Sequence, residues 1–380
     1  MQIVHQGFDG LDVTFQGQLP DAFMDILEEA QLRAQDDGKN ALTEYNGVFF
    51  HVERSGAVGG YKFRCDTGPS GAKWFFKDTR KRNKDPWNIR VSCHSLSLAS
   101  LGLGRVRADI YEFLNTIEAL LPINAERISR VDYAVDFFAP EFELDADAFV
   151  MHARYNRETN EELRTGNGTS GRLGSIRIGK SPGLQAVMYD KRAEIIAKSK
   201  LYWWKVWEDN GLPSNIDRKK PEASRVWRVE LRAGSNYLRR KWGVNSWIDL
   251  HEKGGDVLLS IADRIRYAQT SQDENRSRWK NNEIWDRVIL ALKDDLFELT
   301  SNSTPNDLKE VMRDEHLRMM KSQTIGLLAN WLNAAQVQYE DETDLSLIAA
   351  NIIRSAVDDE TARFIESMEK AKKRYVFLES

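Results

Sequence analysis

The chain has 380 residues, a formal net charge of −4 and 41% hydrophobic residues, which is enough apolar material for two or three globular domains. No apolar run is long enough to cross a bilayer, and the first residues, MQIVHQGFDG, lack the order of a signal peptide, so we expect a cytoplasmic protein. The two cysteines, Cys65 and Cys93, are too few for a disulfide framework or a zinc cluster. We expect both to be small buried residues in strands.

The charge is distributed unevenly along the chain. Residues 161–242 contain 18 lysine and arginine residues but only 9 aspartate and glutamate residues, so the rest of the chain is strongly acidic. A basic middle region can form a local positive groove for a nucleic acid even when the whole chain is slightly acidic. An ordinary solvated surface is the alternative interpretation.

The first two thirds of the chain alternate between strand and helix patterns. Apolar residues at helical spacing predict helices over 21–35, 106–121, 145–155 and 192–207. Alternating patterns predict strands over 11–16, 46–52, 60–65, 72–77, 87–93, 128–138, 184–190 and 226–232. Interleaved strands and helices with hairpins among them indicate an α+β fold, a mainly antiparallel sheet with helices packed on one face.

The last third of the chain has a different secondary-structure pattern. Beyond residue 247 the pattern is helical, and residues 300–306 resemble a linker that caps the next helix. We therefore expect an α+β domain over 1–245 and a helical region over 246–380. The helical region is a candidate for duplex binding or self-association.

The stretch GSIRIGKS, residues 174–181, matches the phosphate-binding pattern G-x-x-x-x-G-K-[ST]. A phosphate loop must open a helix, but here Pro182 and Gly183 follow at once and form a turn signal. The residues before the turn alternate as a strand does. We therefore predict a β-hairpin rather than a nucleotide hydrolase, and its second strand carries Tyr189.

Polar side chains share one face of each of three predicted strands. The two-residue strand period groups Arg130, Asp132 and Asp136 in the first, Arg228, Glu230 and Arg232 in the second, and Tyr189 and Lys191 in the third. If the strands are neighbours, the three carboxylates converge near the tyrosine and the lysine. Carboxylate oxygens suit Mg²⁺ or Mn²⁺. The alternatives are solvent-exposed ion pairs and a half-buried tyrosine that only packs.

A tyrosine near a cation has a specific use. Ionising a phenol with a pKa near 10 at pH 7 costs about 4 kcal/mol, and a nearby metal ion or Lys191 lowers that cost. A phenolate that attacks a phosphodiester forms a covalent phosphotyrosine, which keeps the bond energy for later rejoining.

The order of these motifs resembles one known family. The series ISRVDYAVDFF, RIGKSPGLQAVMYDKRAEI, a tryptophan-rich helix and VWRVELR is similar to the replication-initiation-factor family of rolling-circle plasmid and phage initiators. This transposase-like group also includes certain conjugative relaxases. The resemblance covers residues 61–242. No His-x-His occurs, so the paired-histidine metal site of related nicking enzymes is absent.

The resemblance implies a sheet-based enzyme that nicks one DNA strand and stays attached to the 5′ phosphate. By position, Tyr189 is the nucleophile, with Lys191 and Glu194 as companions. Arg228 and Glu230 form the R-x-E pair. A divalent metal, Mg²⁺ or Mn²⁺, is implied on carboxylates, for which the candidates are Asp132, Asp136, Glu194 and Glu230.

The implied substrate is single-stranded or hairpin origin DNA, with a host helicase and a homodimer as further candidate partners. We expect DNA contacts from basic residues of the middle region: Arg130, Arg177, Lys180, Arg232, Arg239, Arg240 and Lys241. Trp203 and Trp207 are expected in the core, while Trp204 is open to base stacking. A conjugative relaxase with the same chemistry and a non-catalytic, sequence-specific DNA-binding regulator are the alternative functions.

Overall fold

The structure is a computed structural model that describes residues 1–81, 85–163, 169–293, 296 and 300–378. Its contacts divide the chain into two compact units, Met1–Pro305 and Asn306–Ser380. The first unit runs past the boundary that the sequence suggests near residue 245. It does so because helices α6 (Trp247–Arg264) and α7 (Glu283–Ala291) bury apolar residues such as Leu258 and Trp285 in the same core as the sheet.

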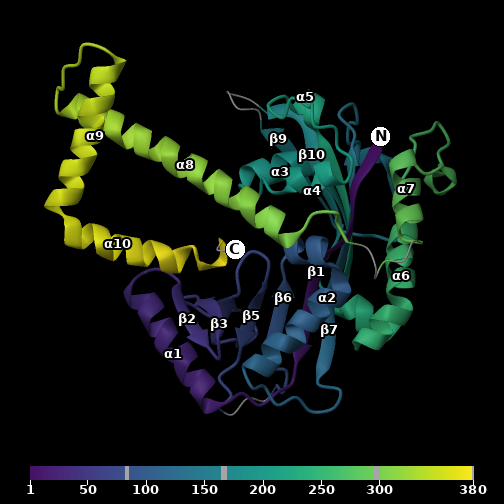
Figure 1. Ribbon diagram of the computed structural model, residues 1–380. Helices are drawn as coiled ribbons and strands as arrows, with labels where there is room; N and C mark the ends of the chain where they lie inside the picture. Colours follow the sequence, from purple (N-terminus) through teal and green to yellow (C-terminus); the bar gives the residue numbers. More distant parts are fainter. Residues whose placement is uncertain (82–84, 164–168, 294–295, 297–299, 379–380) are drawn as a thin grey trace. The chain divides into compact units, whose positions relative to one another are not determined.

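An antiparallel sheet of eleven strands forms the frame of the first unit, which confirms the predicted α+β class (Figure 1). The strand order is β2-β3-β4-β5-β6-β1-β7-β12-β11-β10-β9. The strands are β1 (Gln2–Phe15), β2 (Ala41–Tyr45), β3 (Val48–Val52), β4 (Phe63–Asp66), β5 (Ala72–Phe76), β6 (Ile89–Cys93), β7 (Glu126–Phe138), β9 (Arg157–Leu163), β10 (Thr169–Gly179), β11 (Leu184–Asp190) and β12 (Val226–Gly234).

Among the described residues, the four longest helices of the first unit cover one face of this sheet. They are α1 (Asp21–Asp36), α2 (Ser95–Thr116), α6 (Trp247–Arg264) and α7 (Glu283–Ala291). Aromatic contacts join helices to strands here: Phe113 of α2 stacks on Trp74 at 4.3 Å, and Phe23 of α1 meets Phe76 at 5.3 Å. The alternating apolar residues of the strands point to this face. Cys65 and Cys93 are free, buried and in strands, as predicted.

The opposite face of the sheet carries the polar residues of each strand. A short helix, α4 (Trp203–Asp209), covers part of it where β1, β7 and β12 meet, because Trp203 and Trp207 contact charged groups of those strands. Asp132, Asp136 and Glu230 are at most 2% exposed. The interpretation of these acids as solvent-exposed ion pairs is therefore wrong.

Two predicted helices are corrected by the structure. Residues 145–155 form a single 3₁₀ turn, Ala146–Ala148, and a short strand β8 (Phe149–Met151), which pairs with β13 (Ile265–Tyr267). The predicted helix over 192–207 is two helices, α3 (Lys191–Ala197) and α4, separated by a turn in which Ser199 has a φ of 52°. That left-handed residue ends α3 and redirects the chain.

The second unit is helical, as the sequence indicates for this part of the chain. It contains α8 (Pro305–Ala334), α9 (Glu342–Asp359), α10 (Thr361–Arg374) and the 3₁₀ turn Val376–Leu378. His316 of α8 shares a 2.7 Å hydrogen bond with the hydroxyl of Tyr375, beyond α10. Among the residues that the structure describes, no helix combines the length and apolar character that a membrane span needs.

The stretch GSIRIGKS forms a hairpin, not a phosphate loop. Residues up to Gly179 belong to β10, which pairs with β11 through Ile176↔Met188 and Ile178↔Ala186. A turn follows at Lys180–Gly183, and no helix begins there. Gly179 has a φ of 95°, and a Cβ at this position would lie 2.1 Å from the carbonyl oxygen of Leu184. The hairpin therefore requires glycine here.

Replacing Gly179 with alanine tests this hairpin. The substitution is expected to lower the free energy of unfolding by about 2 kcal/mol or more, because a left-handed conformation and a steric clash are combined. Thermal denaturation measures the loss. Gly104→Ala, in α2 with nothing within 4 Å of the added Cβ, is the matched control and should be neutral or stabilising. Equal melting temperatures for both variants would contradict this account.

Candidate active site

Tyr189 lies on the polar face of the sheet, at a partly exposed position near the end of β11. Strand pairing places it opposite Arg228 of β12. Its hydroxyl donates a 2.6 Å hydrogen bond to Oε1 of Glu230, two residues further along β12. The Nζ of Lys191 lies 3.4 Å from the same hydroxyl. The phenol thus has a carboxylate and an ammonium group within direct reach.

Arg228 is the centre of the charge network behind the tyrosine. It is fully buried, and its Nε and Nη2 donate to the two carboxylate oxygens of Asp136 at 2.5 and 2.7 Å. Its Nη1 donates to Asp9 of β1 at 2.5 Å. One guanidinium therefore joins β12 to β7 and β1. Despite its burial, the two carboxylates hold the pKa of Arg228 well above its usual value.

Two tryptophans of helix α4 cover this charge network. The indole Nε1 of Trp207 donates to Asp136 at 2.8 Å. The Arg228 guanidinium lies 4.3 Å, and the Lys191 ammonium 5.0 Å, from the centroid of the Trp203 ring. Both tryptophans are fully buried, as predicted, and Trp204 is buried as well. These rings exclude water from the charges, which strengthens each interaction.

Lys191 begins α3, directly after β11. Asp190 caps this helix, since its side chain accepts from the backbone nitrogen of Ala193. The buried ammonium of Lys191 forms a 2.7 Å ion pair with Glu194, one helical turn later. Burial lowers the pKa of Lys191, and Arg228 lowers it further. Although burial alone would raise it, Lys191 and Lys198 lower the pKa of Glu194 to about 2.

Asp132 occupies the neighbouring part of β7. It forms an ion pair with Arg130, and the Nε of Arg232 lies 3.7 Å from it. Gly10 of β1 faces it, and a Cβ there would come within 2.7 Å of its Oδ2, so the close approach depends on glycine. Burial raises the pKa of Asp132 to about 6, although Arg130 acts in the opposite direction.

The four carboxylates predicted to bind a metal do not form a metal-binding group. Within the described part of the chain, no cluster of three or more His, Cys, Asp or Glu side chains could hold an ion. Each predicted ligand is engaged by cations instead: Asp136 by Arg228, Asp132 by Arg130, Glu230 by Arg232, and Glu194 by Lys191. As paired here, these carboxylates do not fit a Mg²⁺ or Mn²⁺ site.

The electrostatics of Tyr189 oppose a free phenolate. Burial of the ring and the neighbouring charge of Glu230 raise its pKa well above 10. Arg228 acts in the opposite direction without cancelling them. A phenolate at neutral pH would therefore cost more than the roughly 4 kcal/mol of an unperturbed tyrosine. The hydroxyl instead has a carboxylate oxygen positioned to accept its proton.

Two residues of the site, His5 and Asp9, were missed by sequence reasoning. Both come from β1, whose predicted extent began only at residue 11. Register shifts in its pairing with β7 interrupt the alternation, so Asp9 does not follow the two-residue pattern. His5 is buried against Trp203, with ring centroids 5.1 Å apart, and burial lowers its pKa to about 4. Arg228 lowers the pKa of Asp9 to about 2, although burial acts in the opposite direction.

The basic residues predicted to contact DNA lie in three places. Arg130 and Arg232 are beside Tyr189's network on the polar face of the sheet, and Arg177 is in register with Val187 of β11. Lys180 is exposed in the hairpin turn. Arg239, Arg240 and Lys241 belong to the single π-helical turn Tyr237–Lys241 that follows β12. Their DNA contacts stay predictions.

Comparison with known proteins finds a likeness to solved structures. No protein-family model and no curated protein matches the chain. A solved structure described as a rolling circle replication initiator protein from Geobacillus stearothermophilus is 14% identical, covers 78% of this chain and 97% of that chain, and has a TM-score of 0.39. A likeness at this level carries no argument about function.

Replacing Arg228 tests its structural role. Arg228→Met is expected to lower the free energy of unfolding by about 3–5 kcal/mol, because Asp136 and Asp9 would remain buried without their cation. Chemical denaturation measures this loss. The control is Arg177→Met, which breaks an exposed pair with Glu158 and should cost less than about 1 kcal/mol. Similar losses in both variants would show that Arg228 is not central.

His5 predicts a pH dependence of stability. Its folded pKa of about 4 lies below the ordinary 6.5, so between these values the unfolded chain binds a proton that the folded protein does not. Stability should therefore fall as pH is lowered from about 6.5 to about 4, by up to about 3 kcal/mol from this group. Comparing denaturation of wild type and His5→Gln across this range isolates the effect. If the free energies of unfolding of the two proteins changed in parallel with pH, this role of His5 would be disproved.

Proposed function

We propose that this protein nicks and rejoins one strand of DNA through a covalent 5′-phosphotyrosine at Tyr189, as an initiator of rolling-circle replication. The observation that carries the proposal is the 2.6 Å hydrogen bond from the partly exposed Tyr189 hydroxyl to Glu230, with buried cations behind it. The resemblance of the surrounding motifs to replication initiation factors points to the same chemistry. A conjugative relaxase would use this site in the same way at a transfer origin.

The proposed step is a transesterification at phosphorus. The hydroxyl oxygen of Tyr189 attacks a backbone phosphate while its proton passes to Glu230. The bond from phosphorus to the 3′ oxygen breaks, and the 3′ oxygen takes a proton from water. The products are a tyrosine ester of the 5′ phosphate and a free 3′ hydroxyl. Rejoining reverses the step, with Glu230 returning the proton.

Cations near the hydroxyl fit the charge that develops on the phosphate. The Lys191 ammonium is 3.4 Å from the hydroxyl, and Arg232 holds the far oxygen of Glu230, so that the near oxygen faces the phenol. Arg228 adds positive charge from the buried side. Fixed charges in a site shielded from water stabilise a transition state without reorganising. Because the raised pKa disfavours a free phenolate, proton transfer and attack occur together.

A non-catalytic, sequence-specific DNA-binding regulator on the same fold is the second candidate. One observation favours it: the carboxylates of the site are paired with arginines and lysines, as in a network that only supports structure. Origin DNA would still be the partner, and its contacts would come from the same basic residues. The helicase partner, the homodimer and the role of the helical second unit remain proposals for either function.

Tyr189→Phe separates the two candidates. Wild-type protein incubated with Mg²⁺ or Mn²⁺ and supercoiled DNA that carries the regions flanking its own coding sequence should nick the DNA and form a denaturation-resistant adduct. The phenylalanine variant should form no adduct, because it lacks the attacking oxygen, and should still bind DNA. Adduct formation is read by denaturing electrophoresis.

Tyr202→Phe is the matched control for that experiment. Tyr202 is buried and leads into α4 close to the site, but no hydrogen bond joins it to Glu230. Its variant should form adduct at the wild-type rate. An adduct that persists in Tyr189→Phe would rule out the proposed nucleophile. DNA binding without any adduct in the wild type would favour the regulator.

Glu230→Gln tests the proton acceptor. Glutamine can still accept the Tyr189 hydrogen bond but is a much weaker base, so adduct formation should slow by about 10²–10⁴-fold. Single-turnover kinetics at saturating DNA measure the rate. DNA affinity should change little, since the phenol and the basic residues remain. A rate within about threefold of wild type would assign the proton to another acceptor.

A further inference from the structure

The eleven-stranded sheet has an approximate internal two-fold symmetry. β1 and β7 pair antiparallel at its centre, and β6, β5, β4 and β3 follow on one side as β12, β11, β10 and β9 do on the other. A two-fold axis normal to the sheet between β1 and β7 exchanges these two sets. Such an axis returns each residue to the same face of the sheet. The half that contains Tyr189 therefore has a counterpart around β5 and β6.

The sequence of the two halves supports this symmetry in strand after strand. Three short stretches of the first half, in chain order, match three of the second: Val13-Thr-Phe15 with Val135-Asp-Phe137, Phe75-Phe-Lys77 with Tyr189-Asp-Lys191, and Ile89-Arg-Val91 with Trp227-Arg-Val229. The register agrees. Thr14 pairs with Arg90 and Arg90 with Phe75, just as Asp136 pairs with Arg228 and Arg228 with Tyr189.

Side-chain contacts repeat as well. Lys77 and Lys191 are only 5% and 3% exposed, and each ammonium lies over an aromatic ring, Tyr61 at 5.3 Å and Trp203 at 5.0 Å. The Arg90 guanidinium lies 3.8 Å from the centroid of the Phe75 ring. Phe75 thus occupies the position of the tyrosine.

The counterpart lacks the groups that the proposed chemistry needs. Phe75 has no hydroxyl to attack a phosphate. By the same register, Ser92 stands where Glu230 stands, and Thr14 where Asp136 stands. The first half therefore keeps the arginine and the lysine but has no tyrosine hydroxyl and no carboxylate at these positions. What remains is a basic surface.

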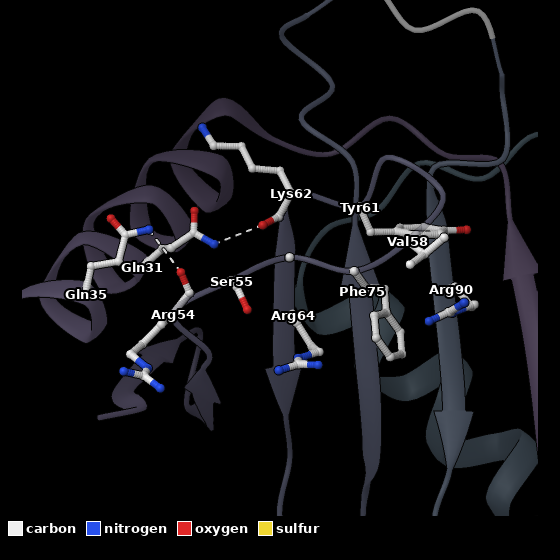
Figure 2. A pocket seen from close by; sticks show the side chains of 12 residues that line it. Gln31, Gln35, Arg54, Ser55, Val58, Tyr61, Lys62, Arg64, Phe75 and Arg90 are labelled. Carbon is white, nitrogen blue, oxygen red and sulfur yellow. Dashed lines mark hydrogen bonds between the residues drawn. The ribbon is translucent and has the colours of Figure 1, made fainter. Parts of the chain in front are cut away.

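An open groove of about 890 Å³ lies at this surface. Figure 2 shows Arg64, Phe75 and Arg90 side by side on β4, β5 and β6, with Tyr61 and Val58 beside them. The Nε atoms of Arg64 and Arg90 are buried and have no hydrogen-bond partner. Arg64 forms an ion pair with Glu53, whereas Arg90 has none within the described part of the chain. Guanidinium groups with unpaired nitrogens at an open groove indicate an anionic ligand. The neighbouring rings of Phe75 and Tyr61 are buried, at 7% and 8% exposed.

We propose that this groove binds single-stranded DNA and is the non-reactive counterpart of the Tyr189 site. The arginines would contact backbone phosphates, with the Arg90 guanidinium held in place against the Phe75 ring. The inference rests on the proposed function for the identity of the nucleic acid. Five strand spacings separate β5 from β11, so the two sites lie about 24 Å apart on one face of the sheet.

Binding of a fluorescent oligodeoxythymidylate of about 16 nucleotides tests the proposal. The full chain carries Tyr189→Phe, so that no cleavage occurs, and fluorescence anisotropy is recorded over a range of salt concentrations. Arg90→Ala and Arg64→Ala should each weaken binding about tenfold and reduce the salt slope by about 1. Phe75→Leu should weaken binding, whereas Phe75→Tyr should not, because it keeps the ring.

Arg105→Ala is the matched control, since Arg105 is exposed on α2, which covers the other face of the sheet. Melting curves verify that each variant is folded. Unchanged affinity in both arginine variants would overturn the proposal. The same titrations are made with an oligouridylate and with duplex DNA. Arginine variants that weaken the binding of only these two ligands, and not of the oligodeoxythymidylate, would also overturn the proposal. The binding assay does not depend on adduct formation. A failure of the proposed chemistry would therefore be seen in the adduct assay and not in this one.

Discussion

The buried guanidinium of Arg228 is the constraint on which the site depends. It holds Asp136 of β7 and Asp9 of β1 at 2.5 Å while carrying no exposed surface itself. Buried charges of this kind are stable only when every partner is present. The pairing of β12 with β7 and the tryptophans of α4 place partners around that one cation. Tyr189 lies at the edge of this network, where the burial ends.

This arrangement explains how an acidic chain can present a site for DNA. Pairing with arginines and lysines neutralises the carboxylates of the polar face, so the face as a whole does not repel phosphate. Glu230 differs in its second partner: Arg232 holds one of its carboxylate oxygens, and the other accepts a hydrogen bond from the Tyr189 hydroxyl. The same backbone scaffold occurs twice in the sheet. Only one copy carries a tyrosine hydroxyl with a carboxylate beside it.

Local patterns were enough to predict much of this fold and part of the site. Strict alternation in residues 128–138 and 226–232 gave the polar face, and Pro182 with Gly183 gave the hairpin that presents Tyr189. Asp9 and His5 could not be predicted, because a register shift in β1 breaks the pattern that would reveal them. The burial of these ion pairs also escaped prediction. It depends on which strands are neighbours, and strand order is not a local property.

The most direct measurement is to identify the residue that becomes attached to DNA. The wild-type adduct is digested with nuclease and protease, and mass spectrometry locates the nucleotide that remains on the peptide. The account predicts a single nucleotide phosphate on the peptide that contains Tyr189. Attachment to any other tyrosine, or to a serine or lysine, would contradict it.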